Sequence, residues 1–373
     1  MNNSSVSTPI HINSLTPLRG IAALWVVLFH ADVCLYYRDL GALIDRDASG
    51  IFSRGYLWVD FFFLLSGFII AHVYGDRLRQ ENKWFQLKCY LLARFSRLYP
   101  LHFFTLSVLV VGSLVAGSLF PVIIDGSWNT YFSWSALPSN LLFLNAMNQH
   151  VYLSWNIVSW SIGAEWWTYV AAIGLIISLR GKPLGLIALV ALFAFTCLIY
   201  LVYQFSNHNL DITYSAGFIR CFFEFAIGLC LYEAYSRACA QKYLSADAVF
   251  ALLMVFVLLI FHFKWADLSV IPVFSLLILA AAYNSGRIKV ALAWPPFQYL
   301  GTISYSIYLM HGIWFMFFWF GFPQWKAEYS IGELSVLFKA IYLLLFVGLT
   351  IGSAHFSYRY IEVPGRRLLR KHS

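Results

Sequence analysis

An arginine and a histidine stand eleven positions apart in the apolar stretch PLRGIAALWVVLFHAD, which runs from Pro17 to Asp32. In a helix, eleven steps of about 100° return to within about 20° of the starting direction, so Arg19 and His30 share one face, about 16 Å apart along the axis. A guanidinium binds anions, and an imidazole exchanges protons near neutral pH. The pair marks a candidate site; the alternative is that Arg19 reaches lipid phosphates and His30 bonds a neighbouring helix.

The segment ARFSRLYP supplies a second pair of basic residues. Arg94 and Arg97 are three positions apart, so they project from one face of a helix. Two guanidinium forks on one face can grip a phosphate together. We interpret them as candidate ligands of a phosphorylated cytosolic molecule. The alternative is an ordinary basic flank of a membrane segment.

Further polar residues interrupt two other apolar segments. Glu165 lies in SWNIVSWSIGAEWWTYV, where an isolated carboxylate is costly unless it is paired or protonated. In GTISYSIYLMHGIW, Ser304, Tyr308 and His311 follow the spacing i, i+4, i+7 and form one polar stripe. For Ser304 and Tyr308, a hydrogen-bonded seam between helices is the simpler interpretation.

Three charged residues are candidates for a site on the acceptor side or for a structural role. Asp60 opens the apolar segment GYLWVDFFFLLSGFII, where it can cap a helix or join an outer polar site. Arg220 and Glu224 are four positions apart, which favours mutual neutralisation, with substrate binding by Arg220 as the alternative. The Ser66-Gly67 pair is predicted to pack helices closely and not to supply a nucleophile.

Membrane helices are the elements that must position these residues. The chain is 61% hydrophobic and 11% charged, whereas an ordinary soluble domain is about 25% charged. We predict one all-α, polytopic membrane domain of about ten helices. The predicted spans are 16–36, 57–75, 91–119, 157–178, 184–204, 213–235, 246–263, 268–284, 300–321 and 334–358. The third span is too long for a perpendicular crossing, so we expect it to tilt, protrude or kink at Pro100.

Lysine and arginine in the short loops predict the orientation. Most of them fall in 76–90, 179–183, 236–245, 285–298 and the C-terminal tail, which lie on one side if ten helices alternate. Both termini are therefore expected in the cytoplasm. The predicted parts are a cytoplasmic N-terminal tail (1–15), the transmembrane domain (16–358) and a basic cytoplasmic C-terminal tail (359–373). No signal-peptide pattern is present, so the first helix is expected to be retained.

Charge and cysteine content narrow the possible partners. The net charge of +8 follows from this topology, so we do not interpret it as a nucleic-acid signal. The six cysteines form no Cys-x-x-Cys pair and are expected to be buried apolar residues, not disulfides or metal ligands. No metal site and no permanently bound cofactor are predicted.

Six motifs resemble, in order over nearly the whole chain, the acyltransferase-3 family of bacterial membrane O-acyltransferases. They are LRGIAALWVVLFH, VDFFFLLSGF, RFSRLYP, WSIGAEWW, SYSIYLMH and IEVPGRR. The Arg-x10-His and Arg-x-x-Arg patterns of that family fall on Arg19/His30 and Arg94/Arg97. The resemblance implies transfer of an acyl group, with acetyl expected, from cytoplasmic acyl-CoA to a sugar of an O-antigen (lipopolysaccharide), exopolysaccharide or glycolipid. It also implies a stand-alone enzyme of the bacterial inner membrane.

The resemblance implies a role for each candidate residue. His30 is expected to be the general base that removes the hydroxyl proton. Tyr308 or a protonated His311 would stabilise negative charge on the thioester oxygen. Arg94 and Arg97, with Arg19, would hold the CoA phosphates. Glu165 would orient or protonate His30, or bind the acceptor sugar.

Two other functions remain open at this point. In a proton-coupled transporter or flippase of an envelope intermediate, His30, Glu165 and His311 would form a proton relay. The membrane-bound O-acyltransferases with a buried Asn/His pair are a second enzyme class, but the Arg-x10-His helix near the N-terminus argues against them. A purely structural subunit explains the paired arginines poorly.

Overall fold

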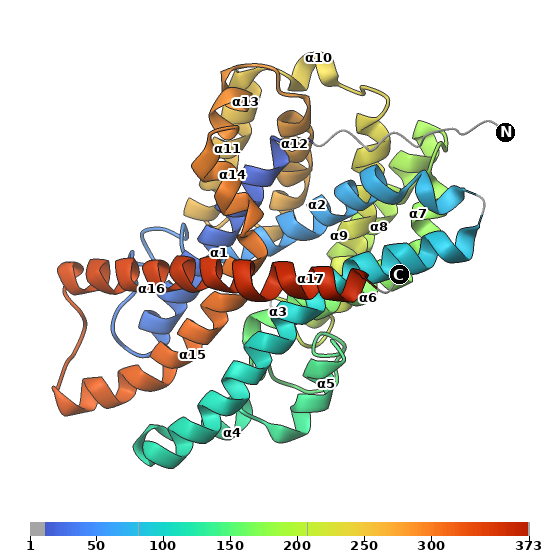
Figure 1. The fold of residues 1–373 in the computed structure, drawn as a ribbon. Coiled ribbons are helices and arrows are strands. Elements are labelled where there is room, and N and C mark those ends of the chain that lie inside the picture. Colours follow the sequence, from blue (N-terminus) through green and yellow to red (C-terminus); the bar gives the residue numbers. More distant parts are fainter. Residues whose placement is uncertain (1–11, 81, 207, 372–373) are drawn as a thin grey trace.

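The computed structural model describes residues 12–80, 82–206 and 208–371, and these residues form helices and no strand. Residues 1–11 of the predicted N-terminal tail lie outside the described residues. The main helices, shown in Figure 1, are α1 (Leu15–Tyr37), α2 (Trp58–Tyr74), α3 (Lys83–Leu119), α6 (Trp160–Ala171), α7 (Ile173–Leu179), α8 (Leu184–Phe205), α9 (Gly217–Tyr235), α11 (Asp247–His262), α12 (Val270–Tyr283), α14 (Pro295–Thr302), α15 (Ser304–Glu328), α16 (Val336–Ser357) and α17 (Val363–Arg370). Each of the ten predicted spans overlaps at least one of them.

Length and hydropathy support a multi-pass membrane protein. Within the described residues, five helices are long and apolar enough to cross a membrane. The number rises to seven if α6 with α7, bent by 55°, and α14 with α15, bent by 63°, each count as one span. The apolar helices α11 and α12 have only 16 and 14 residues, and α9 carries three charged residues. The count of ten crossings stays a prediction.

Helix α3 is longer than the sequence predicts. It begins at Lys83 instead of residue 91 and has 37 residues, which corresponds to about 55 Å against a bilayer core of about 30 Å. The helix continues through Pro100. Trp84, in its first turn, is 82% exposed. The extra length therefore lies at the N-terminal end of α3.

Glycine pairs bring the central helices into close contact. A Cβ at Gly67 of α2 would lie 2.1 Å from the carbonyl oxygen of Phe225 in α9, and a Cβ at Gly228 of α9 would lie 2.0 Å from that of Leu64. The prediction of close helix packing at Gly67 is therefore confirmed. A Cβ at Gly20 of α1 would similarly lie 2.7 Å from the backbone nitrogen of Gly301 in α14. This contact sets α1, and the adjacent Arg19, against the C-terminal end of α14.

The helix that starts as α16 continues past residue 358, where the sequence predicts the end of the last span. A π-helical turn (Tyr358–Glu362) leads directly into α17, which packs on α3 (Figure 1). Glu362 is 1% exposed, and its carboxylate accepts hydrogen bonds from Ser306 and Arg366. The assignment of 359–373 as a separate cytoplasmic tail stays a prediction.

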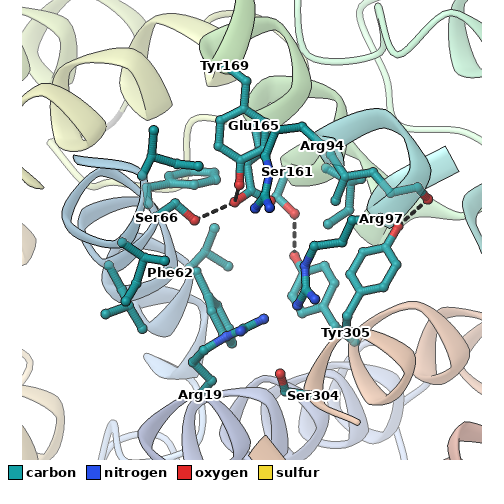
Figure 2. A pocket seen from close by; sticks show the side chains of 18 residues that line it. Arg19, Phe62, Ser66, Arg94, Arg97, Ser161, Glu165, Tyr169, Ser304 and Tyr305 are labelled. Atoms are coloured by element: carbon teal, nitrogen blue, oxygen red, sulfur yellow. Dashed lines mark hydrogen bonds between the residues drawn. The ribbon is translucent and has the colours of Figure 1, made fainter. Parts of the chain in front are cut away.

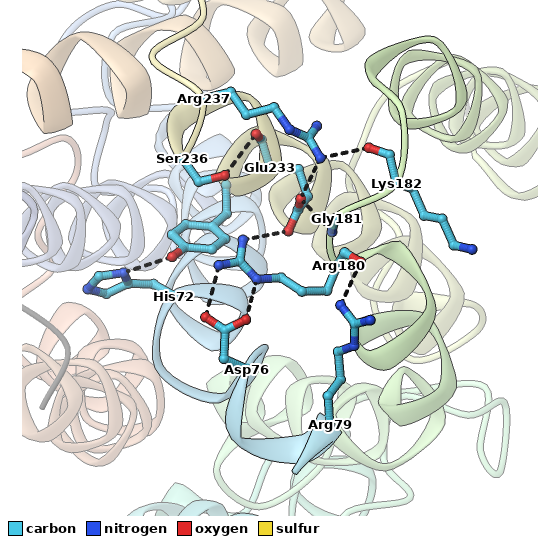
Figure 3. A network of polar contacts seen from close by, with 10 residues as sticks. His72, Asp76, Arg79, Arg180, Gly181, Lys182, Glu233, Ser236 and Arg237 are labelled. Carbon is cyan, nitrogen blue, oxygen red and sulfur yellow. Dashed lines mark hydrogen bonds and ion pairs between the residues drawn. The ribbon is translucent and has the colours of Figure 1, made fainter. Parts of the chain in front are cut away.

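Ion pairs join the loops that the charge pattern places on one side (Figure 3). Arg180 donates to Asp76 at 2.7 and 2.9 Å and to Glu233 at 3.0 Å, and Arg237 lies 3.3 Å from Glu233. The hydrogen bonds from Arg180 lower the pKa of Asp76 below its ordinary value, so this pair is ionised at neutral pH. Three loops thus meet at one end, as the alternation of spans predicts. Their cytoplasmic location stays a prediction.

At the opposite end, four basic residues form ion pairs with carboxylates. They lie in loops predicted to be outside or at the outer end of α15: Arg38 pairs with Asp125, Arg46 with Asp32, Arg54 with Asp267 and Lys326 with Asp39. Ion pairs therefore neutralise basic side chains at both ends of the helices, and the two ends differ in the amount of basic charge.

Candidate active site

Arginines from two helices meet in one cavity of about 90 Å³, which we call the arginine cavity (Figure 2). Arg19 comes from α1, Arg94 and Arg97 come from α3, and Glu165 comes from α6. The other polar residues of the lining are Ser66, Ser161, Tyr169, Ser304, Tyr305 and Tyr308. Arg19 therefore contributes to a cavity with the Arg-x-x-Arg pair, and lipid anchoring is not needed to explain it.

None of the three arginines forms an ion pair with a carboxylate of the described residues. Arg94 donates to the Tyr74 hydroxyl at 3.1 Å, and the Arg97 guanidinium lies 6.0 Å from the ring centre of Tyr305. The Nε of Arg94 and the hydroxyl of Ser304 are buried without a hydrogen-bond partner among these residues. Burying unpaired cations and donors is costly. The arrangement favours an anionic ligand in this cavity.

Glu165 is held by hydroxyl groups. Its carboxylate accepts hydrogen bonds from Ser66 of α2 and from Tyr169, one helical turn further along α6 (Figure 2 shows the Ser66 bond). Both bonds reach Oε1 of the carboxylate, and the Ser66 bond connects α6 to α2. The structure places Glu165 in the arginine cavity and not in contact with His30.

His30 lines a different cavity of about 360 Å³, which we call the histidine chamber. Its walls are largely aromatic and include Phe29, Tyr56 and Trp160, with Arg220 as a cationic member. Although Arg19 and His30 lie on one helix at the predicted spacing, their side chains contribute to different cavities. The face of α1 that carries both residues therefore borders both cavities.

The hydrogen bonds of two histidines define their tautomers. Nδ1 of His30 lies 3.0 Å from the Val26 carbonyl oxygen, and Nδ1 of His311 lies 3.2 Å from that of Ile307. A carbonyl oxygen only accepts, so both neutral rings carry their proton on Nδ1. Nε2 of His311, 3.3 Å from Nδ1 of His30, is then a second acceptor for the His30 N–H. Nε2 of His30 is left free to take up a proton.

Tyr308 separates the two cavities. Of all the lining residues, only Tyr308 and Val59 belong to both the arginine cavity and the histidine chamber. The Tyr308 hydroxyl accepts a hydrogen bond from Ser161 at 2.8 Å, which fits the predicted seam between helices. The stripe of Ser304, Tyr308 and His311 along α15 therefore runs from the arginine cavity past this wall to His30.

Asp60, Arg220 and Glu224 form a buried charge cluster beside the chamber. Nη2 and Nε of Arg220 lie 2.7 and 3.0 Å from the Asp60 carboxylate, and Nε lies 3.4 Å from Glu224. All three residues are at most 1% exposed. The predicted Arg220–Glu224 contact is present, but Asp60 is the closer partner. The cluster thus links α2 to α9.

Replacing Arg220 by methionine should strongly destabilise the protein, because two buried carboxyl groups would lose their cation. Removing one partner of a buried ion pair costs about 3–5 kcal/mol. The measurement is the midpoint of thermal unfolding in detergent. Lys339→Met, which breaks a pair with the 69% exposed Glu333, is the control and should change the midpoint little. Equal melting of the two variants would contradict a structural role for the cluster.

Sequence reasoning missed several residues of both cavities. Ser161 and Tyr169 lie four positions on either side of Glu165, so the helical period could have placed them on its face. Asp211, from the loop between α8 and α9, and Trp319, among many aromatic residues of α15, line the histidine chamber without any periodic signal. All six cysteines are free thiols, and no cluster of metal-ligating side chains occurs in the parts of the chain described.

Comparisons with known proteins indicate the family of the chain. A family model, that of the acyltransferase-3 family and described as an acyltransferase domain, matches residues 12–358. The chain is 37% identical to "Protein 2 in picA locus" of Rhizobium radiobacter over 28% of this chain and 47% of that protein. It is 28% identical to "Acyltransferase MdmB" of Streptomyces mycarofaciens over 43% of this chain and 38% of that protein. The chain thus matches less than half the length of either relative. No solved structure matches it.

Proposed function

Because this chain belongs to the acyltransferase-3 family, we propose that it moves an acyl group, with acetyl as the expected one, from cytoplasmic acyl-CoA to a hydroxyl of a cell-envelope sugar. The family and the apolar helices make it a membrane acyltransferase. The donor, the acceptor and a location in the bacterial inner membrane belong to the proposal.

The choice of acyl-CoA as the donor rests on the unpaired arginines. Three guanidinium groups line a cavity with one carboxylate, which accepts its hydrogen bonds from hydroxyl groups. CoA carries several phosphates, and guanidinium forks bind phosphate oxygens well. A cavity of about 90 Å³ is far too small for the nucleotide. The nucleotide would therefore stay outside, with the phosphates near Arg94 and Arg97.

His30 is suited to activate the acceptor hydroxyl. Its free Nε2 takes the hydroxyl proton while the hydroxyl oxygen attacks the thioester carbonyl. The tetrahedral intermediate then collapses, the carbon–sulfur bond breaks, and the proton passes from His30 to the CoA thiolate. The Val26 carbonyl and Nε2 of His311, both facing the His30 N–H, would stabilise the imidazolium formed in between.

Tyr308 lies where the thioester would have to meet the hydroxyl. It belongs to both cavities, and its hydroxyl proton can turn from Ser161 to a reacting oxygen, because Ser161 also has the Val158 carbonyl as a hydrogen-bond partner at 3.2 Å. That proton can stabilise the negative oxygen of the tetrahedral intermediate. In the tautomer described, Nε2 of His311 accepts a hydrogen bond, so Tyr308 is the better candidate for this task.

The proton-relay alternative finds less support. A relay needs its members connected by hydrogen bonds or water. His30 and His311 are in contact, but Glu165 lies in the other cavity and is bonded to Ser66 and Tyr169. The cavities lined by Glu165 and by His30 are separated by Tyr308.

The proposed function predicts a mass change in the envelope. Cells that carry the chain should contain envelope glycan heavier by one acyl group per modified sugar than cells from which it is deleted. Mass spectrometry of the purified polysaccharide and glycolipid measures this difference and identifies both acyl group and sugar. The purified protein should also release CoA from acetyl-CoA when such glycan is added. Identical glycan masses together with transport of an unmodified intermediate would contradict the proposal.

A further inference from the structure

We propose that Asp211 and Trp319 recognise the acceptor in the histidine chamber, with Asp211 accepting a hydrogen bond from a sugar hydroxyl and Trp319 donating one to a sugar oxygen. The inference rests on the proposed function, because it assumes that the acceptor enters the chamber lined by His30. It adds the residues that select a polyhydroxylated ring over other alcohols.

Asp211 offers an unused acceptor at the chamber. It belongs to the loop between α8 and α9, and its carboxylate forms no hydrogen bond or ion pair with any described residue. Two other carboxylates near this end are occupied: Asp267 pairs with Arg54, and Asp32 pairs with Arg46. Asp211 is exposed, so its carboxylate remains accessible to a ligand at the chamber that it lines.

Trp319 offers an unused donor at the same chamber. Its indole Nε1 is buried and has no hydrogen-bond partner among the described residues. The ring is held in place by the Arg38 guanidinium, 4.1 Å from its centre, and by Phe315, which stacks at 5.3 Å. A fixed indole with a buried, unpaired N–H is costly unless a ligand accepts that hydrogen bond.

A donor and an acceptor on aromatic walls match a sugar. Sugar hydroxyls both donate and accept, and the C–H faces of a sugar ring pack on aromatic rings such as Phe29 and Tyr56. An alkyl alcohol has one hydroxyl, which His30 would engage, and would leave Asp211 and Trp319 unsatisfied. The volume of about 360 Å³ is at the small end of ligand pockets, which favours one ring over a longer chain.

The test compares acceptors in the full-length enzyme in nanodiscs, with acetyl-CoA as donor. The acceptors are a panel of p-nitrophenyl hexosides and, as a simple alcohol, 1-hexanol. Asp211→Asn and Trp319→Phe should each raise the KM of the best hexoside about 10-fold or more. The KM for acetyl-CoA and the rate with 1-hexanol should stay within about twofold. Asp47→Asn, an exposed carboxylate outside the chamber, is the control and should change none of these values.

The possible failures point to different assumptions. If the wild type acylates a hexoside and both variants keep its KM, or if they slow 1-hexanol equally, the assignment of these two residues is wrong. If 1-hexanol is as good an acceptor as every hexoside, selection of a sugar ring is wrong. If the wild type consumes no acetyl-CoA with its native envelope glycan, the proposed function fails and this inference fails with it.

Discussion

Acyl transfer should fall by about 10²–10⁴-fold when His30 is replaced by alanine, since the hydroxyl would lose its general base. Binding of acetyl-CoA should be nearly unchanged, because His30 and the arginines line different cavities. The measurements are the rate of CoA release with glycan acceptor and the affinity for a CoA thioester, both in the purified protein. This separation of rate from donor binding is specific to the two-cavity arrangement.

Two further variants make the His30 result interpretable. His262→Ala removes an exposed histidine that contacts Ser49 outside both cavities, and it should retain activity. His311→Gln should lower the rate of acyl transfer less than His30→Ala does, because the base itself stays in place. It should also shift the pH profile of this rate, because the His30 N–H loses the ring nitrogen that faces it. A His30→Ala enzyme with normal transfer would refute the assignment of the base.

The second large effect concerns the donor. Arg94→Ala and Arg97→Ala should each raise the KM for acyl-CoA about 10- to 100-fold, the usual range for a lost hydrogen bond to a charged group. The KM for the acceptor should change little. Lysine at either position should restore only part of the affinity, because an ammonium cannot make the two-pronged contact of a guanidinium.

Arg287 supplies the matched control for the donor effect. It is an exposed arginine in a loop predicted to lie at the same side of the membrane and does not line the arginine cavity. Arg287→Ala should leave both KM values unchanged, which separates a specific phosphate contact from a general loss of positive charge. A larger effect of Arg94→Ala or Arg97→Ala on the acceptor KM than on the donor KM would mean that the donor enters elsewhere.

The sequence was sufficient to locate the helices but not their exact extent. A helix occurs in each of the ten apolar runs, because membrane helices must satisfy their backbone hydrogen bonds internally. The extra length of α3 before residue 91 was missed, since Lys83 to Tyr90 is polar enough to resemble a loop. The continuation of the helix from α16 through Glu362 was missed, because the apolar run that predicts the span ends before the helical backbone does.

The site could be predicted along each helix but not between helices. Spacing placed Arg94 beside Arg97, and Ser304, Tyr308 and His311 on one stripe, because the helical period fixes such neighbours. The grouping of Arg19 with Arg94, and of His30 with His311, depends on how α1, α3 and α15 pack. For the same reason the sequence left open whether Glu165 contacts His30 or serves the acceptor, since a tertiary contact has no signal in local spacing; in the structure Glu165 bonds Ser66 and Tyr169.

The wall formed by Tyr308 and Val59 has a consequence for the energetics of the whole cell. Moving one elementary charge across a membrane potential of 100 mV releases about 2.3 kcal/mol, so any continuous aqueous path would dissipate the proton gradient. The arginine cavity and the histidine chamber meet at two side chains, one of them a tyrosine anchored by Ser161. In the proposed reaction an acyl group passes this point in one direction while the hydroxyl proton passes to the CoA thiolate in the other, so no net charge crosses the bilayer in a catalytic cycle.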